Sequence, residues 1–187
     1  MGQWGMADIS TPPSSRAFHS IHRHGMVRVA ACTPRTHVGD PAANLRETLD
    51  LVRRGEEQHV DLMLFPELGL SAYAIDDLHL QDALLEGVER AIGELVQASR
   101  ELSQVFIVGA PLRRSDCLYN CAIAIHGGEI LGVVPKSFLP NYREFYENRW
   151  FRPGAGIRDA SITVAGRSVP FGTDVIFGAS DFAAWTM

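Results

Sequence analysis

Two short segments of almost uninterrupted apolar residues place the strongest constraint on how this chain can fold. They are VDLMLF at 60–65 and VFIVGAP at 105–111, and such runs are typical of strands that are buried on both faces of a sheet. Amphipathic helices can cover one face, so the other face must also meet apolar groups. A second sheet is the economical answer, and the sequence therefore predicts an α/β domain built as an α-β-β-α sandwich.

A helical pattern precedes each apolar segment. The stretch 39–59 predicts a helix with Asp40 as its cap and Pro41 at its first position, and a second amphipathic helix is expected over 82–102. The predicted buried sides are Leu45, Leu49 and Val52 in the first helix and Leu84, Leu85, Val88, Ile92, Leu95 and Val96 in the second. The other expected elements are a strand at 27–32, a hairpin at 118–136 that turns at Gly127 and Gly128, and short strands within 161–177.

Length and charge exclude several classes of protein. The chain has 187 residues, 46% of them apolar, which suffices for one domain with a substantial core. Its net charge of -5, with acidic and basic residues interspersed, gives no footprint for nucleic acid or an anionic membrane. No apolar run approaches the roughly 20 residues that span a bilayer. Residues 1–17 are expected to be a disordered extension, and 18–187 to form the domain.

Cysteine and histidine content points to a reduced protein without a metal centre. The chain has three cysteines, an odd and low number: Cys32, Cys117 and Cys121. With no secretory signal at the start of the chain, they indicate reduced thiols and a cytoplasmic location. The segment FHSIHRHG holds three histidines: His19, His22 and His24. Nothing nearby fixes a coordination geometry, so a solvated or packing role is favoured over metal binding.

Glu67 and Lys136 occupy positions that are typical of an active site. Glu67 follows the apolar strand at 60–65, at the end of the strand where sites of α/β sheets are built, although a cap or turn carboxylate explains the position equally well. Lys136 also follows an apolar strand and could stabilise an oxyanion. Taken alone, a surface lysine with a buried stem is the favoured explanation. Two opposite charges at strand ends could, however, share one pocket.

Further residues near Lys136 could complete such a site. Glu147 is a third possible charge, and Tyr142 and Tyr146 could line an entrance, although Tyr146 is more often simple packing. A carboxylate and a lysine in one cleft suit a cysteine nucleophile, because the carboxylate can take the thiol proton and the lysine can stabilise the anion. The three cysteines fit this role poorly, and buried inert thiols are the preferred interpretation for all of them.

Two motifs resemble a known superfamily. FPELGLSAY (65–73) and PKSFLPNYREFYE (135–147) resemble the glutamate and lysine motifs of the nitrilase, or carbon-nitrogen hydrolase, superfamily, whose members use a Glu-Lys-Cys triad on an α-β-β-α sandwich. Longer stretches are similar to the family of N-terminal glutaminase domains of bacterial glutamine-dependent NAD+ synthetases. They are RVAACTPRTHVGDPAANL, DDLHLQDALLEGV, LYNCAIAIHGGEILGVVPKSFLPNYREFYENRWFRPG and VPFGTDVIF. The resemblance covers about 18–181, nearly the whole chain.

The resemblance implies a role for each candidate residue. Glu67 would be the general base, Lys136 would stabilise the tetrahedral intermediate, and Glu147 resembles the second active-site glutamate of the superfamily. Tyr142 would flank the glutamine pocket, and Tyr73 would lie near the base. The implied reaction is hydrolysis of L-glutamine through a thioester, which releases ammonia for the amidation of deamido-NAD+. This step would need no cofactor, whereas ATP and Mg serve the separate synthetase domain of the family.

The chain departs from the family pattern at the nucleophile. The family's cysteine follows the strand that corresponds to VIF at 175–177, and this sequence ends at Met187 without it. The expectation is a partial glutaminase domain that lacks the cysteine and the synthetase domain and is inactive alone. A non-catalytic module or scaffold, or another nitrilase-family amidase, remains open. A homo-oligomer is expected for the full-length protein, with no nucleic-acid or membrane partner.

Overall fold

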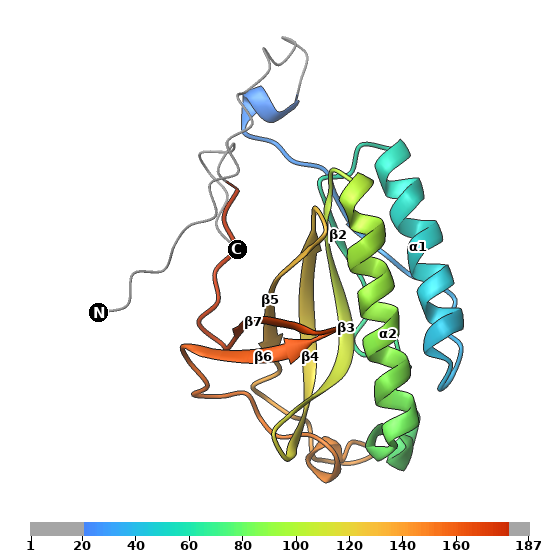
Figure 1. Cartoon of the computed structure of the whole chain (residues 1–187), viewed down its shortest axis with the longest axis vertical. Helices are drawn as coiled ribbons and strands as arrows, with labels where there is room; N and C mark the ends of the chain where they lie inside the picture. The colour runs from blue at the N-terminus through green and yellow to red at the C-terminus, as the bar shows by residue number, and fades with distance from the viewer. Residues whose placement is uncertain (1–20, 180–187) are drawn as a thin grey trace. The chain divides into compact units, whose positions relative to one another are not determined.

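A computed structural model describes residues 21–179 (Figure 1), so the extension predicted at 1–17 lies outside the described residues. Residues 28–175 form one compact unit. The strands are β1 (Val29–Ala31), β2 (Leu62–Leu64), β3 (Val105–Arg114), β4 (Cys117–His126), β5 (Glu129–Pro135), β6 (Ala160–Val164) and β7 (Arg167–Phe171). The long helices are α1 (Pro41–Glu57) and α2 (Asp82–Ala98), and the short 3-10 helices are η1 (Ile21–His24), η2 (Asp76–Leu80), η3 (Ser99–Glu101) and η4 (Glu147–Arg149).

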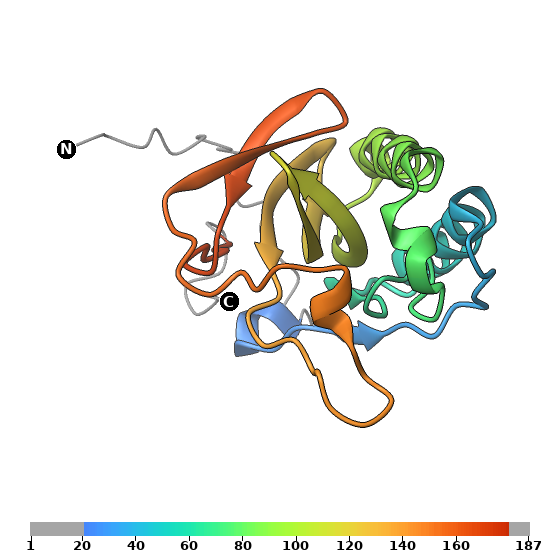
Figure 2. The ribbon, with the colours of Figure 1, turned by 90° about the horizontal axis from the view of Figure 1, so that it is seen from below.

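All seven strands join one sheet in the order β1-β2-β3-β4-β5-β7-β6. β1, β2 and β3 run parallel, whereas β4 is antiparallel to both β3 and β5, so β2, β3 and β5 end at the same edge of the sheet. The sequence predicted a second sheet. Within residues 21–179, β6 and β7 instead extend the first sheet (Figure 2), because β7 pairs with β5 between Val133 and Phe171.

Helix α1 begins where the sequence predicted. The Asp40 side chain accepts a hydrogen bond from the backbone N–H of Ala43 at 3.0 Å, and Pro41 stands at the first helical position. Near its end the helix lies close to the sheet, since a Cβ atom at Gly55 would come within 2.3 Å of the Met63 sulfur. The missing side chain of Gly55 thus allows α1 to pack directly on β2.

The main core lies on the side of the sheet that carries both long helices (Figures 1 and 2). The six residues of α2 that the sequence assigned to its buried side are all buried. They belong to the same apolar cluster as alternate side chains of the two central strands, apart from Leu84 and Leu85, which join smaller clusters. The strand residues are Phe106, Val108, Ala110 and Leu112 from β3 and Tyr119, Cys121, Ile123 and Ile125 from β4.

The opposite face of the sheet is more open in the part of the chain that the structure describes. Val29 pairs with Leu62, and side chains two residues apart on a strand share a face, so Val29, Leu62 and Leu64 lie together there. Val29 is 62% exposed and Leu64 is 54% exposed, whereas Met63 on the helix side is only 2% exposed. The prediction that the segment 60–65 is buried on both faces is therefore wrong for the described residues, because only one face has helices to cover it.

Candidate active site

Glu67 and Lys136 meet at the edge of the sheet where β2 and β5 end. Lys136 Nζ donates a hydrogen bond to Glu67 Oε1 at 2.6 Å, which confirms the prediction that the two charges share one place. Their strands are not neighbours in the sheet, because β3 and β4 lie between β2 and β5. For the contact to form, the chain after β2 must leave its own strand and pass over β3.

Gly109 of β3 allows this crossing. The segment that follows β2 passes directly over it, and a Cβ atom at Gly109 would lie 2.5 Å from both Pro66 O and Leu68 N. The backbone N–H of Leu70 then donates to Gly109 O at 3.2 Å. Leu68 adopts a positive φ of 51° in this segment, a conformation that is uncommon for residues other than glycine. The bare backbone of β3 and this turn together carry Glu67 toward β4.

Lys136 is held by its backbone as well as by its side chain. Its N–H donates to Asn120 O at 2.8 Å, and its carbonyl accepts from Gly154 N at 2.8 Å. The side-chain ammonium bridges two carboxyl groups, with Glu67 Oε1 at 2.6 Å and Glu147 Oε1 at 2.9 Å. Lys136 is the single lysine among the 187 residues, and its ammonium acts here as a point charge with several donors.

Glu147 is buried at the start of η4 and is only 1% exposed. Besides Lys136, its Oε1 accepts a hydrogen bond from the Tyr73 hydroxyl at 2.5 Å. Its second oxygen, Oε2, is buried and has no hydrogen-bond partner among the described residues. We call Glu67, Lys136, Glu147 and Tyr73 the carboxylate–lysine cluster. All four are residues that the sequence singled out.

Electrostatics keep the two proton donors of this cluster protonated. Burial alone lowers the pKa of Lys136, but the hydrogen bonds to Glu67 and Glu147 outweigh it and the pKa of the ammonium is raised. The pKa of Tyr73 is raised by burial first and then by its hydrogen bond to Glu147. The ammonium and the phenol therefore both remain donors to the carboxyl groups in the neutral pH range.

An aromatic group that the sequence did not single out supports Tyr73. His79 is fully buried, its Nε2 lies 3.2 Å from the carbonyl oxygen of Tyr73, and its ring packs against Trp150 and Phe151 at centroid distances of 5.5 and 4.9 Å. Burial lowers the pKa of His79, so its ring is neutral. The motif DDLHL gives no local sign that its histidine is buried. The rings that pack against His79 are more than 60 residues away in sequence, and its nearby partner is a backbone carbonyl.

Next to the cluster, η2 and η4 are joined by an exposed contact, which we call the Asp77–Arg149 clamp. Arg149 donates through Nε and Nη2 to the two oxygens of Asp77, each at 2.7 Å, and Trp150 Nε1 donates to Asp77 Oδ1 at 2.9 Å. The hydrogen bonds from Arg149 and then Trp150 lower the pKa of Asp77. The clamp therefore fixes the short helix that begins with Glu147.

The two other tyrosines of the lysine motif lie apart from the cluster. Tyr142 is 63% exposed and packs on Phe145, and it lines a hollow of about 540 Å³ formed mostly by the segment 137–142. Tyr146 donates through its hydroxyl to Asp76 at 3.0 Å. Neither contacts Glu67 or Lys136 in the described residues. Of the two substrate-binding candidates, the structure thus places Tyr73 inside the cluster and Tyr142 outside it.

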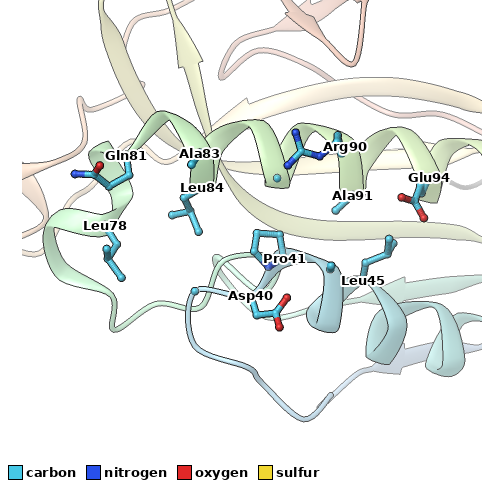
Figure 3. Close-up of a pocket in the computed structure, with 13 residues that line it drawn as sticks. Asp40, Pro41, Leu45, Leu78, Gln81, Ala83, Leu84, Arg90, Ala91 and Glu94 are labelled. Carbon is cyan, nitrogen blue, oxygen red and sulfur yellow. The ribbon is translucent and has the colours of Figure 1, made fainter.

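A second groove, elsewhere on the molecule, does not belong to this site. It measures about 510 Å³ and lies between α1 and α2, where Pro41, Leu45 and Leu84 form an apolar wall beside Arg90 and Glu94 (Figure 3). No member of the carboxylate–lysine cluster lines it. Among residues 21–179 no group of three or more His, Cys, Asp or Glu side chains could hold a metal ion, and His19 lies outside the described residues.

Asn120 is the residue of the site that sequence reasoning missed. It is 4% exposed, and its side-chain amide donates to Glu67 Oε1. The signal was present: Asn is depleted in strands, yet Asn120 interrupts the apolar strand LYNCAIAI. A buried polar group needs a partner, and the partner here is Glu67, which reaches Asn120 from the far side of β3.

A profile of the carbon-nitrogen hydrolase family matches residues 28–179, which include every residue of this site. The chain belongs to the carbon-nitrogen hydrolase family.

Individual relatives of this carbon-nitrogen hydrolase carry one name. The glutamine-dependent NAD(+) synthetase of Mycobacterium tuberculosis is 51% identical over 170 residues, which are 91% of this chain and 25% of that protein. The synthetase of Mycobacterium leprae is 46% identical over 164 residues, 88% of this chain and 24% of that protein. The chain thus spans about a quarter of the length of the curated relatives it matches.

Solved structures agree with the family assignment. The glutamine-dependent NAD(+) synthetase from Cytophaga hutchinsonii matches 82% of this chain with a TM-score of 0.76 and 25% identity, over 26% of its own length. An amidase of the nitrilase superfamily from Nesterenkonia matches 76% of the chain with a TM-score of 0.61 and 24% identity, over 53% of its length. The fold is the nitrilase-type α/β fold that the sequence predicted. In the described residues no helix has the length and apolar character needed to cross a membrane.

None of the three thiols of this carbon-nitrogen hydrolase lies in hydrogen-bond contact with Glu67 or Lys136. Cys121 is 2% exposed, on the helix side of β4, and its thiol donates to Tyr119 O at 3.6 Å. Burial raises the pKa of both Cys121 and Cys32, so both stay protonated. Cys117 packs against the main core. These placements fit the interpretation of inert thiols.

Proposed function

We propose that this chain carries the acid–base part of a glutaminase site, which acts on L-glutamine together with a cysteine outside these 187 residues. The observation that carries the proposal is the contact of one ammonium with two carboxyl groups at a strand edge, Lys136 with Glu67 and Glu147. The choice of glutamine rests on relatives that are named glutamine-dependent NAD(+) synthetases. The cluster supplies the base and the positive charge that such a hydrolysis needs.

In the proposed reaction, Glu67 takes the proton of the cysteine thiol, and the thiolate attacks the side-chain carbonyl carbon of glutamine. Lys136 stabilises the negative charge that develops on the carbonyl oxygen. The carbon–nitrogen bond then breaks, and the nitrogen leaves as ammonia with the proton that Glu67 returns. Water, activated by Glu67, hydrolyses the thioester and yields glutamate. Glu147 and Tyr73 keep the ammonium in place during these steps.

For the wider setting of this reaction we extend the proposal from the names of the same relatives. We place it in NAD+ synthesis, where the ammonia would amidate deamido-NAD+ on a separate synthetase domain that uses ATP and Mg. The hydrolysis itself would need no cofactor. A cytoplasmic, homo-oligomeric protein without a nucleic-acid or membrane partner is the assembly that we propose for it.

A non-catalytic role is the second candidate, and the placement of the cysteines favours it for the chain taken alone. We expect the purified 187-residue chain to release no ammonia from L-glutamine above background, because no thiol contacts Glu67. Fusion to the part of the Mycobacterium tuberculosis relative that follows the matched 170 residues should restore hydrolysis. Glu67→Gln in this fusion should abolish it. Ammonia release by the chain alone that stops on alkylation of Cys32 would overturn the assignment.

Substrate binding can be tested without turnover because Lys136 is the single lysine. Labelling lysine with 15N at Nζ yields one side-chain signal beside the Glu67 and Glu147 carboxyl groups. We expect L-glutamine to shift this signal and D-glutamine to leave it unchanged. An Arg113→Lys variant provides a second, distant lysine signal as an internal control. Equal shifts of both signals, or none, would contradict glutamine binding at the cluster.

A further inference from the structure

Asn120 contacts both members of the central pair of the site. Its side-chain amide donates to Glu67 Oε1, and its backbone carbonyl accepts from the N–H of Lys136 at 2.8 Å. Glu67 and Lys136 come from strands that are separated by two others. A single residue of β4 therefore fixes the carboxyl group through its side chain and the lysine through its main chain.

The contacts to Glu67 are unequal at its two oxygens. Oε1 receives two donors, the Asn120 amide and the Lys136 ammonium. Among the residues that the structure describes, none donates to Oε2. A lone pair that already accepts a hydrogen bond is less available for a proton, so Oε2 is the more basic oxygen in this arrangement.

We propose that Asn120 is a positioning residue that orients the Glu67 carboxyl group, so that Oε1 stays bound to the amide and the ammonium and Oε2 faces the reacting proton. The proposal rests on the proposed function for the identity of the reaction. Beyond that function, the proposal states which of the two Glu67 oxygens accepts the proton. Lys136 alone cannot make this selection, because its three protons rotate about a single Cε–Nζ bond and can follow either oxygen.

Burial strengthens this role. Asn120 is 4% exposed on the central strand β4, with Tyr119 and Cys121 on either side packed in the main core. Its side chain therefore cannot swing into solvent when Glu67 moves. An amide has two donor protons in a fixed plane, and a planar donor on a rigid strand fixes the orientation of a carboxyl group better than a flexible lysine does.

The first test is direct and uses the full 187-residue chain. The chain has four asparagines, so 15N labelling of asparagine gives four side-chain amide pairs, and Asn120→Ala identifies one of them. We expect the Asn120 pair to shift strongly in Glu67→Ala and to stay unchanged in Gln104→Ala. Gln104 is a matched control, because its fully buried amide donates to Val52 O at 2.8 Å at the opposite end of β3. If the side-chain amide signals of Asn120 do not shift in Glu67→Ala, the proposal is wrong.

The second test separates positioning from general destabilisation. It compares the affinity of L-glutamine with that of L-norvaline, whose side chain ends in a methyl group where glutamine carries the carboxamide. Losing a hydrogen bond to a charged group should weaken L-glutamine binding about tenfold in Asn120→Ala and leave L-norvaline binding unchanged. Asn120→Asp should weaken L-glutamine binding further, since it sets a carboxyl group against Oε1. Gln104→Ala should change neither affinity.

The outcomes of the two tests are distinguishable. Equal weakening of both ligands by Asn120→Ala indicates a structural role and overturns the positioning role. A wild-type chain that binds L-glutamine no better than L-norvaline contradicts the proposed function. In that case the asparagine spectrum still decides whether Asn120 fixes the Glu67 carboxyl group.

Discussion

The short helix η4 joins two ion-pair sites that differ in how deeply Glu147 and Arg149 are buried and in how their charges pair. In the carboxylate–lysine cluster one ammonium serves two carboxyl groups, and Glu147 has a side chain only 2% exposed. In the Asp77–Arg149 clamp one guanidinium serves one carboxylate through both oxygens, with side chains that are 58% and 55% exposed. The two sites are two residues apart in sequence, at Glu147 and Arg149.

The difference shows what each site is for. A charge in water is already solvated, so an exposed pair such as the clamp adds little stability and mainly fixes geometry. A buried charge must be paired, because the free energy lost on removing it from water exceeds the stabilisation that most single contacts provide. The cluster keeps four ionisable groups in contact despite this cost, and leaves Glu147 Oε2 without a donor among the described residues. Such an arrangement is typical of a site that performs chemistry.

The largest effect should come from removing the ammonium of the cluster. Lys136→Met preserves the length of the side chain but leaves Glu147 buried without its charged partner. Breaking a buried pair from one side costs about 3–5 kcal/mol, and we expect a loss of this size in the free energy of urea unfolding at pH 7. Arg113→Met is the control, since it removes an exposed pair with Asp82 at 2.7 Å and should cost much less. Similar losses for the two variants would contradict the comparison.

The pH dependence of the same variant sharpens this prediction. The pKa of Lys136 is raised in the folded chain. A base with a raised pKa contributes stability that is complete below its unfolded-state pKa and is lost as the pH rises through its folded-state pKa. The difference in stability between wild type and Lys136→Met should therefore be constant near neutral pH and shrink at strongly alkaline pH. The single lysine signal in 15N NMR should report the same titration directly.

A smaller effect should follow the loss of the Tyr73 hydroxyl. Tyr73→Phe removes the 2.5 Å hydrogen bond to Glu147 but keeps the ring against Leu68 and Phe151 in its cluster. A hydrogen bond to a charged group contributes about 1.5–3 kcal/mol, and we expect a loss near the lower value because Lys136 still pairs with Glu147. Tyr142→Phe is the control: its hydroxyl has no partner in the described residues, and its loss should leave unfolding unchanged. A larger loss for Tyr142→Phe would argue against the cluster as the buried site.

Local patterns predicted much of this structure. The structure confirms the predicted cap at Asp40, the buried side of α2 and the turn at Gly127 and Gly128, because each depends on residues close together in sequence. Glu67 and Lys136 were also paired correctly, since both follow apolar strands. The order of the strands between them could not be predicted, because it depends on long-range pairing of the hairpin.

Two features lay beyond sequence reasoning for a related reason. Gly109 matters only because another segment crosses it at 2.5 Å, and nothing in VFIVGAP reveals that crossing. The clamp joins residues that are 72 positions apart, so neither Asp77 nor Arg149 could be told from an ordinary surface charge. Asn120 is different, because a polar residue within an apolar strand is a local signal that predicts a buried partner, and the hairpin pattern of the same strand does not identify that partner as Glu67.

The smallest effect should come from the clamp, and its dependence on solution conditions should distinguish it from the cluster. Asp77→Asn keeps the shape of the side chain but removes the charge that faces Arg149, so we expect a smaller loss of stability than in Tyr73→Phe. Screening by 1 M salt should remove most of this loss, whereas the deficit of Lys136→Met should persist, because salt screens exposed pairs far more than buried ones.

The pKa of Asp77 is lowered in the folded chain, so its contribution is complete above the unfolded-state pKa and is lost as the pH falls through the folded-state pKa. The wild type and Asp77→Asn should therefore differ at neutral pH and converge in strong acid. Asp50→Asn, which breaks the exposed pair with Arg53 at 3.3 Å within α1, is the matched control and should change stability still less, because that pair joins one helix to itself. A deficit of Asp77→Asn that survives high salt would place the clamp with the buried cluster, and the contrast between the two sites would then be wrong.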